Sequence, residues 1–226
     1  FFHLQSNSLP GKILEELARE IHFAGTHEET KVIILRSGGE KTFCSGASFD
    51  ELASIKNEKE GLKFFSGFAN VINAMRKCPK FIIGRIQGKC VGGGVGLAAA
   101  VDYALATGKA EIKLSELAVG IGPFVVGPAV ERKIGTGAFC ALAIDATAWR
   151  STDWAKRKGL FAEVHESIDG MDEAVYRLAN TLAHSNPTAM AEMKKIFWRG
   201  TENWDELLKE RAAISGKLVL SQFTRN

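Results

Sequence analysis

The sequence predicts an α/β protein with a largely parallel sheet and a helical C-terminal part. Apolar segments of strand length alternate with helical patterns up to about residue 140, and helical patterns dominate the remainder. Strands joined through helices run parallel, with right-handed connections. A chain of 226 residues suits one large domain or one and a half small ones. We expect a core over 1–140 and a helical region over 141–226 that form one functional unit.

The individual elements follow from periodicity and from turn residues. A helix is expected to begin at Pro10 and to end near Gly25, and 42–52 reads as a loop that enters another helix. Apolar runs and alternation predict strands at 32–35, 81–86, 103–107 and 111–114. Helical spacing of apolar side chains predicts helices at 58–76, 171–184, 187–199 and 202–215.

Composition excludes several classes of protein. The net charge is +3 and the basic residues are spread along the chain, so no nucleic-acid surface is expected. No apolar run approaches the roughly 20 residues that span a bilayer, and we expect no membrane association. The four cysteines show no CxxC spacing. Reduced thiols, no metal site and a cytoplasmic location are therefore expected.

A glycine-rich stretch, 84–102, is the most informative part of the chain. An apolar strand enters it, Gly92-Gly93-Gly94 turn the chain, and a run of small residues leaves it as a buried helix. Backbone N–H groups at the start of a helix have no partner inside the helix, and the helix dipole favours negative charge there. The stretch therefore predicts a site that faces an anion or a developing negative charge.

A second loop, 44–47, has the same physical character, because small residues there also lead from one element into a helix. If neighbouring strands bring the two loops together, each could offer one N–H group to a single oxygen, which would form an oxyanion hole. Two tight turns without a ligand are the alternative. A dinucleotide site fits less well, because no suitably placed acidic residue follows the glycines. The P-loop and GxSxG motifs are absent.

Three motifs, taken together, resemble the crotonase family, also called the enoyl-CoA hydratase/isomerase family. They are Phe43-Cys44-Ser45-Gly46-Ala47, Gln87-Gly88 with Gly92-Gly93-Gly94 and Asp102, and Ser115-Glu116-Leu117 with Gly120. The resemblance covers essentially the whole chain. It implies a ClpP/crotonase-type spiral of repeated ββα units with a helical C-terminal trimerisation region. It also implies an acyl-CoA thioester as substrate, with coenzyme A as part of that substrate and no separate cofactor, and a homotrimer or a dimer of trimers.

The resemblance also assigns roles to residues. The N–H groups of Ala47 and Gly93 would hold the thioester oxygen, and Glu116 would be the acid/base. Apolar neighbours of Glu116 should raise the pKa of its carboxyl group. A plain surface carboxylate is the alternative for Glu116. The expected substrate-binding residues are Ser45, Gly46, Phe49, Gly92, Gly96 and Phe124, with Ser45, Gly46 and Phe49 toward the adenine end of CoA and Phe124 in the wall of the acyl pocket.

One departure from the family pattern decides between reactions. Hydratases of the family carry a second Glu where this chain has Gly96. A single carboxylate favours a proton shuttle, so we expect double-bond isomerisation of an enoyl-CoA. Hydration despite the missing Glu and a non-catalytic acyl-CoA-binding subunit are the alternatives. A serine peptidase of the related ClpP-like fold is disfavoured because no His lies near a candidate Ser. The stripe of Phe64, Phe65 and Phe68 is expected to be mainly core, and Glu131 is expected on a solvated helix face.

Overall fold

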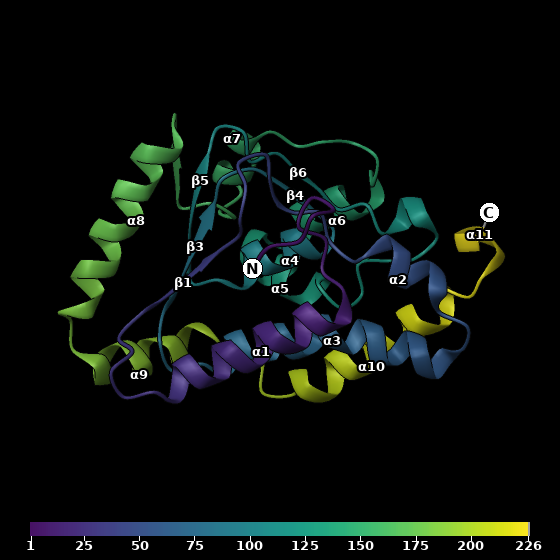
Figure 1. The fold of residues 1–226 in the computed structure, drawn as a ribbon, viewed down its shortest axis with the longest axis horizontal. Coiled ribbons are helices and arrows are strands. Elements are labelled where there is room, and N and C mark those ends of the chain that lie inside the picture. Colours follow the sequence, from purple (N-terminus) through teal and green to yellow (C-terminus); the bar gives the residue numbers. More distant parts are fainter. Residues whose placement is uncertain (226) are drawn as a thin grey trace.

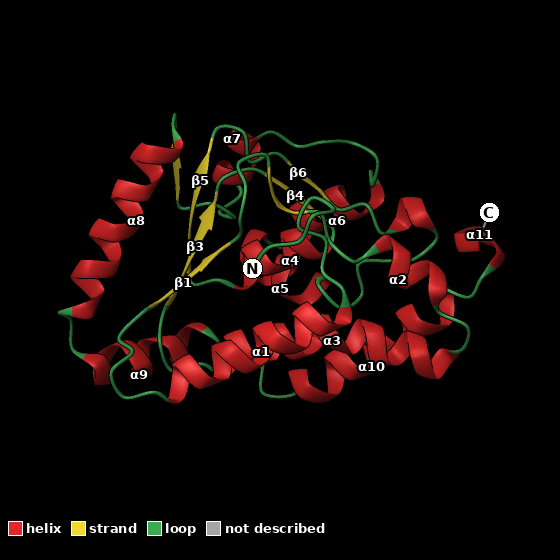
Figure 2. Ribbon diagram, in the orientation of Figure 1, coloured by secondary structure: helices red, strands yellow, loops and turns green. Residues whose placement is uncertain are grey.

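Two parallel sheets form the centre of the molecule, which is seen in a computed structural model that describes residues 1–225. One sheet has the strand order β1-β3-β5-β7 and the other β2-β4-β6, and the strands are the yellow arrows of Figure 2. The first sheet consists of β1 (Ile33–Arg36), β3 (Ile82–Ile86), β5 (Tyr103–Thr107) and β7 (Glu163–His165). The second consists of β2 (Thr42–Cys44), β4 (Lys89–Val91) and β6 (Ile112–Lys113).

The chain alternates between the two sheets as it advances. Each of the pairs β1/β2, β3/β4 and β5/β6 gives one strand to each sheet. Helices follow each pair: α2 (Phe49–Ser54) and α3 (Glu58–Lys77), then α4 (Gly93–Ala100), then α5 (Gly127–Ile134). Successive ββα turns therefore stack in parallel, which confirms the predicted spiral of ββα units.

Three strands were not predicted from the sequence: β2, β4 and β7. Each has three residues, too few for an alternating pattern to be recognised. Their positions are fixed by distant partners, as where Thr42 pairs with Lys89 and Leu105 pairs with Glu163. The region over 141–226 is mainly helical, as predicted, and β7 is the strand within it that returns to the core sheet.

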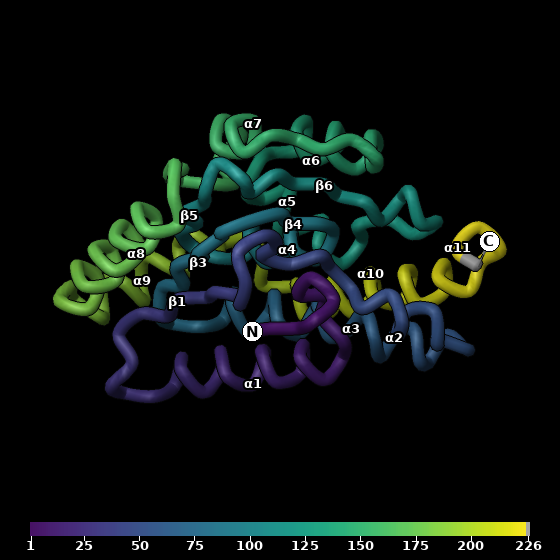
Figure 3. Tube along the Cα trace, turned by 45° about the horizontal axis from the view of Figure 1, so that its top comes forward, coloured from purple at the N-terminus to yellow at the C-terminus, as the bar shows by residue number. Residues whose placement is uncertain are grey.

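Helices surround the two sheets (Figure 1). The helix α1 (Gly11–Thr26) lies beside α3, and α3 lies beside α10 (Trp204–Leu218), in a layer along the lower edge of Figure 1. Figure 3 shows α6 (Thr136–Ile144) and α7 (Thr152–Arg157) on the opposite side of the strands from α1. The remaining helices are α8 (Ile168–Ala183), α9 (Pro187–Phe197) and α11 (Gln222–Arg225), with a 3₁₀ turn at Leu117–Val119. The predicted C-terminal helices agree with α8, α9 and α10 to within three residues at each end.

Two glycines allow α10 to lie directly on α3. A Cβ atom on Gly61 would come within 2.6 Å of the Gly216 carbonyl oxygen, and one on Gly216 would come within 2.6 Å of the Leu62 nitrogen. Any side chain at either position would force the helices apart. This contact holds a C-terminal helix against the first ββα unit of the spiral.

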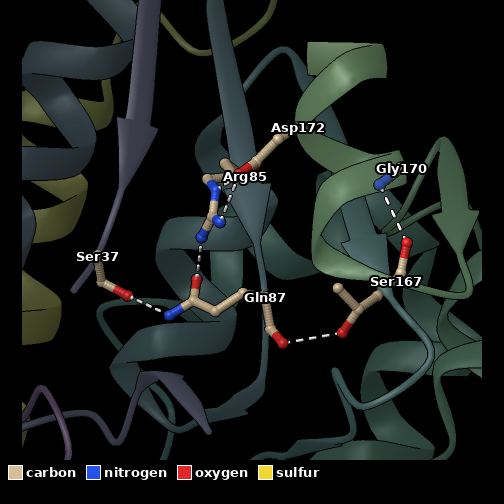
Figure 4. Close-up of polar contacts among 7 residues, drawn as sticks. Ser37, Arg85, Gln87, Ser167, Gly170 and Asp172 are labelled. Atoms are coloured by element: carbon tan, nitrogen blue, oxygen red, sulfur yellow. Dashed lines mark hydrogen bonds and ion pairs between the residues drawn. The ribbon is translucent and has the colours of Figure 1, made fainter. Parts of the chain in front are cut away.

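An ion pair between the buried Arg85 and the partly exposed Asp172 fastens α8 to the first sheet (Figure 4). Arg85 of β3 donates from Nε to Asp172 Oδ1 at 2.6 Å and from Nη2 to Oδ2 at 2.9 Å. Arg85 also donates to the buried Gln87 side chain, which in turn donates to the Ser37 hydroxyl. The guanidinium therefore has partners on both sides, as a buried cation requires.

Asp102, the residue two positions beyond α4, anchors α9. Its carboxylate accepts hydrogen bonds from the Ile82 N–H group at 2.7 Å, from Lys194 Nζ at 2.8 Å and from Trp198 Nε1 at 3.3 Å. Only 2% of the Lys194 side chain and 8% of the Asp102 side chain are exposed. The motif residue Asp102 is thus a structural anion that pairs with a buried ammonium group.

Within residues 1–225, no helix has the length and apolar character that crossing a bilayer requires.

Asp102→Asn should destabilise the fold strongly, because it leaves the Lys194 ammonium group buried without a counter-charge. We expect the free energy of unfolding to fall by roughly 3 kcal/mol. Urea denaturation measures this change. Glu192→Gln is the control on the exposed face of α9, since Glu192 and its partner Lys195 are largely exposed, and its cost should stay below about 0.5 kcal/mol. Similar losses in the two variants would contradict the role given to Asp102.

Candidate active site

A pocket opens between the loop after β2, the start of α4 and the segment that follows β6. Every predicted site residue except Gly96 lines it: Ser45, Gly46, Ala47, Phe49, Gly92, Gly93, Glu116 and Phe124. These residues come from three successive ββα units of the spiral. The parallel arrangement brings them together, because β2, β4 and β6 end at the same edge of their sheet.

The two small-residue loops lie in direct backbone contact. Gly46 has a φ of +89°, and a Cβ atom there would come within 2.9 Å of the Val91 carbonyl oxygen and 3.3 Å of the Gly93 nitrogen. A Cβ atom on Gly94 would lie 2.3 Å from the Cys44 carbonyl oxygen. Both the left-handed backbone and the close approach therefore require glycine.

Two residues that line the pocket, Ala47 and Gly93, have backbone N–H groups that no protein acceptor among the described residues occupies. Leu9 bridges the loop, since its N–H group donates to the Gly46 carbonyl at 2.8 Å and its carbonyl accepts from the Ser48 N–H group at 3.3 Å. In such a bridge the intervening residue, Ala47, directs its own N–H group the other way. Within residues 1–225, neither the Ala47 nor the Gly93 N–H group donates a hydrogen bond. The pair is thus available to a bound oxygen.

The turn that presents Gly93 is held from both sides. The Gly92 N–H group donates to the Lys113 carbonyl at 2.9 Å, and the Gly92 carbonyl accepts from the Val95 N–H group at 2.9 Å. A Cβ atom on Gly93 would lie 2.2 Å from a ring carbon of Phe68. The aromatic ring therefore packs directly on the backbone of Gly93 and fixes its position at the first residue of α4.

Glu116 is the acidic group of the pocket. A carboxylate oxygen of Glu116 lies 3.1 Å from where a Cβ atom on Gly92 would stand. The other oxygen, Oε2, is buried and has no hydrogen-bond partner in the part of the chain that the structure describes. Burial raises the pKa of this carboxyl group to about 7, against a smaller opposing effect of its own backbone N–H group. An orphaned acid that titrates near neutral pH is a strong candidate for proton transfer.

Most of the remaining pocket wall is apolar. Phe65 and Phe68 of α3 line it, whereas Phe64 does not, and all three rings belong to the buried core. Sequence reasoning identified the run around Phe124 but missed other lining residues: Leu52, Ser115, Val119, Ile121 and Ser215. Ser215 comes from α10, and no local signal in the sequence places that helix beside the glycine turn.

Gly96 is not among the residues that line the pocket, and its predicted contact with substrate stays a prediction. A Cβ atom at this position would lie 2.6 Å from both Cβ and Cγ1 of Val126, so the backbone of α4 packs directly under that side chain. Among the described residues that line the pocket, Glu116 carries the one carboxylate. Glu131 lies outside the pocket and accepts a hydrogen bond from the Thr136 hydroxyl.

Comparison with known proteins assigns the chain to a family. Residues 4–222 match the family model for enoyl-CoA hydratase/isomerase, and the chain belongs to that family. It is 27% identical over 216 residues to ethylmalonyl-CoA decarboxylase of Danio rerio, which covers 93% of this chain and 70% of the relative. It is 31% identical over 201 residues to mitochondrial methylglutaconyl-CoA hydratase of Mus musculus, and this match covers 87% of the chain but 63% of the relative, less than two thirds.

The crotonase fold is confirmed by comparison with solved structures. The crystal structure of enoyl-CoA hydratase from Bacillus halodurans superposes with a TM-score of 0.88 at 22% sequence identity, over 97% of this chain and 89% of that chain. Such low identity establishes the fold alone. The family assignment rests instead on the sequence match, which covers most of residues 1–226.

Glu116 should make the stability of the protein depend on pH. The folded chain holds the Glu116 proton more tightly than the unfolded chain does. As the pH rises, Glu116 therefore ionises in the unfolded chain before it ionises in the folded chain, and this stabilises the unfolded chain relative to the folded one. Stability should therefore decline between about pH 4.5 and about pH 7 and level off above that range. Thermal melting of the wild type and of Glu116→Gln over pH 4–8 measures the effect, because the difference between the two isolates this group. A difference that does not change with pH would contradict the raised pKa.

Proposed function

We propose that this chain is an acyl-CoA enzyme that isomerises the double bond of an enoyl-CoA. The observation that carries the proposal is the pocket itself: it combines the buried Glu116 carboxyl group, whose Oε2 has no partner among the described residues, with the unpaired N–H groups of Ala47 and Gly93. The family match supports a CoA thioester as substrate. Coenzyme A would enter as part of the substrate, with no separate cofactor. Ser45, Gly46 and Phe49, which line the pocket, would take its adenine end.

The reaction is a proton transfer within one molecule. In a 3-enoyl-CoA, the Glu116 carboxylate removes a proton from C2, and the electron pair moves through the acyl group onto the thioester oxygen. The N–H groups of Ala47 and Gly93 donate to this oxygen and contribute several kcal/mol to the stability of the dienolate. Glu116 then returns the proton to C4, and the double bond lies between C2 and C3. No further reactant is consumed or released.

The pKa of Glu116 suits this task. A group that first accepts and then donates a proton works best when its pKa lies near the working pH. With a pKa of about 7, Glu116 is ionised in a large fraction of molecules at neutral pH and holds the transferred proton long enough to return it. A fully solvated carboxylate, with its lower pKa, would be a weaker base in the first step.

Hydration of a 2-enoyl-CoA is the alternative reaction. It is favoured by the similarity to methylglutaconyl-CoA hydratase. It would require a water molecule to be oriented and split, and the position of the second Glu in hydratases is occupied by Gly96, which lies under Val126. A non-catalytic acyl-CoA-binding subunit is the remaining alternative.

We further propose that the chain assembles as a homotrimer or a dimer of trimers. Large apolar side chains on α9 support this proposal, because Met193, Ile196 and Phe197 are each 45–59% exposed. Such a group of exposed apolar side chains on one helix is typical of an interface.

Glu116→Gln should abolish isomerisation while leaving thioester binding intact. Gln keeps the shape of the side chain but cannot accept the proton, so turnover of a 3-enoyl-CoA should fall at least about 100-fold. Calorimetric binding of a saturated acyl-CoA should persist. Glu131→Gln is the matched control, since Glu131 lies outside the pocket, and it should retain full turnover. Undiminished activity of Glu116→Gln would contradict the assignment of the base.

The two candidate reactions separate by their products. Incubation with a 3-enoyl-CoA should yield the 2-enoyl isomer, and incubation with a 2-enoyl-CoA should yield the reverse equilibrium without a 3-hydroxyacyl product. Chromatography with mass detection distinguishes the two, because hydration adds 18 mass units, the mass of one water molecule, to the substrate. Rapid formation of the hydrated product would favour hydration over isomerisation.

A further inference from the structure

The charge of the pocket restricts what acyl group it can hold. Apolar side chains make up most of the wall, including Phe65, Phe68, Ile121, Phe124 and Val126. Among the described residues that line the pocket there is no Lys, Arg or His, and the one charged side chain is that of Glu116. The wall therefore offers no counter-charge to an anion.

The polar groups that remain are hydroxyls and backbone N–H groups. The hydroxyls are those of Ser45, Ser115 and Ser215. Ser215 lines the pocket and is 1% exposed as a residue. A hydroxyl can donate one hydrogen bond, but it cannot neutralise a charge. The unpaired N–H groups of Ala47 and Gly93 do favour negative charge, but in the proposed reaction they bind the thioester oxygen.

A free carboxylate on the acyl group, in addition to the thioester carbonyl, would therefore be strongly disfavoured. It would lose its hydration in an apolar pocket without a cationic partner, and this costs more than any single hydrogen bond recovers. Glu116 would add repulsion between like charges whenever it is ionised, and a nearby anion would raise its pKa further and impair it as a base. A neutral aliphatic group meets neither penalty and gains from contact with the apolar wall.

We propose that the pocket selects CoA thioesters whose acyl group is neutral and aliphatic, and that it excludes acyl groups that carry a free carboxylate. This inference rests on the proposed function, because it treats the pocket as the acyl-CoA site. It separates this chain from relatives whose names specify ethylmalonyl-CoA and methylglutaconyl-CoA, since both of those acyl groups carry a free carboxylate.

A shape-matched pair of ligands tests the selection. Succinyl-CoA and 4-methylpentanoyl-CoA have the same branching at the end of the acyl chain, and two methyl groups in the latter replace two carboxylate oxygens. Neither has the double bond that the reaction requires, so both measure binding alone. Calorimetry on the wild-type protein at pH 7.5 should give an affinity for 4-methylpentanoyl-CoA at least about tenfold higher than for succinyl-CoA. Equal affinities, or a preference for succinyl-CoA, would overturn the inference.

A charged substitution in the wall provides the converse test. Phe124 lines the pocket and is partly buried. Phe124→Lys adds a cation there, and Phe124→Met is the control of similar length without charge. The preference for 4-methylpentanoyl-CoA should shrink or reverse in Phe124→Lys and persist in Phe124→Met. An unchanged preference in a folded Phe124→Lys protein, as judged by its melting temperature, would contradict the role of wall charge.

The outcomes distinguish this inference from the proposed function. If neither thioester binds more tightly than free coenzyme A and no enoyl-CoA is turned over, the pocket is not an acyl site and both proposals fail. If enoyl-CoA is isomerised but succinyl-CoA binds as tightly as its neutral match, the function stands and the selection by charge fails. The wild-type comparison alone decides the inference if Phe124→Lys does not fold.

Discussion

The site depends on one contact between two backbones. The loop after β2 meets the start of α4 at Gly46, Gly93 and Gly94. A Cβ atom at any of these three positions would lie closer than 3.0 Å to another atom. At Gly46 the left-handed backbone is a second reason for glycine. Because the backbones meet, two N–H groups from separate turns of the spiral can face one point. Side-chain donors would be mobile by comparison, whereas these donors are fixed by two neighbouring strands of one sheet and a helix.

The surrounding structure keeps this contact in place. Phe68 presses on Gly93 from α3, and α3 itself is held against α10 through Gly61 and Gly216. Asp102, at the end of the same glycine-rich stretch, pairs with Lys194 of α9. Two C-terminal helices thus support the site. The helix α10 does so through its contact with α3, and α9 does so through the buried ion pair between Asp102 and Lys194. This explains why a pocket built mainly from residues 45–126 also includes Ser215.

Much of this arrangement could be predicted from the sequence, because it depends on local chemistry. The glycine turn, the small-residue loop and the Glu116 motif each have a local signature, and the longer strands and helices have clear periodicity. The short strands β2, β4 and β7 could not be predicted, since three residues form a strand only when a distant partner supplies the hydrogen bonds. The packing of Gly96 against Val126 could not be predicted for a similar reason, because the two residues lie 30 positions apart along the chain.

Cys44 illustrates a chemical consequence of the same close packing. Its carbonyl lies against Gly94, and its thiol accepts a hydrogen bond from the Gly46 N–H group at 3.4 Å. Complete burial raises the pKa of this thiol to about 12, so almost no thiolate exists at cellular pH, and thiolate is the form that oxidants and alkylating agents attack. A cysteine in the loop that supplies the Ala47 N–H group is thus held inert toward redox chemistry. The loop can carry a soft, compact side chain without exposing the site to oxidative inactivation.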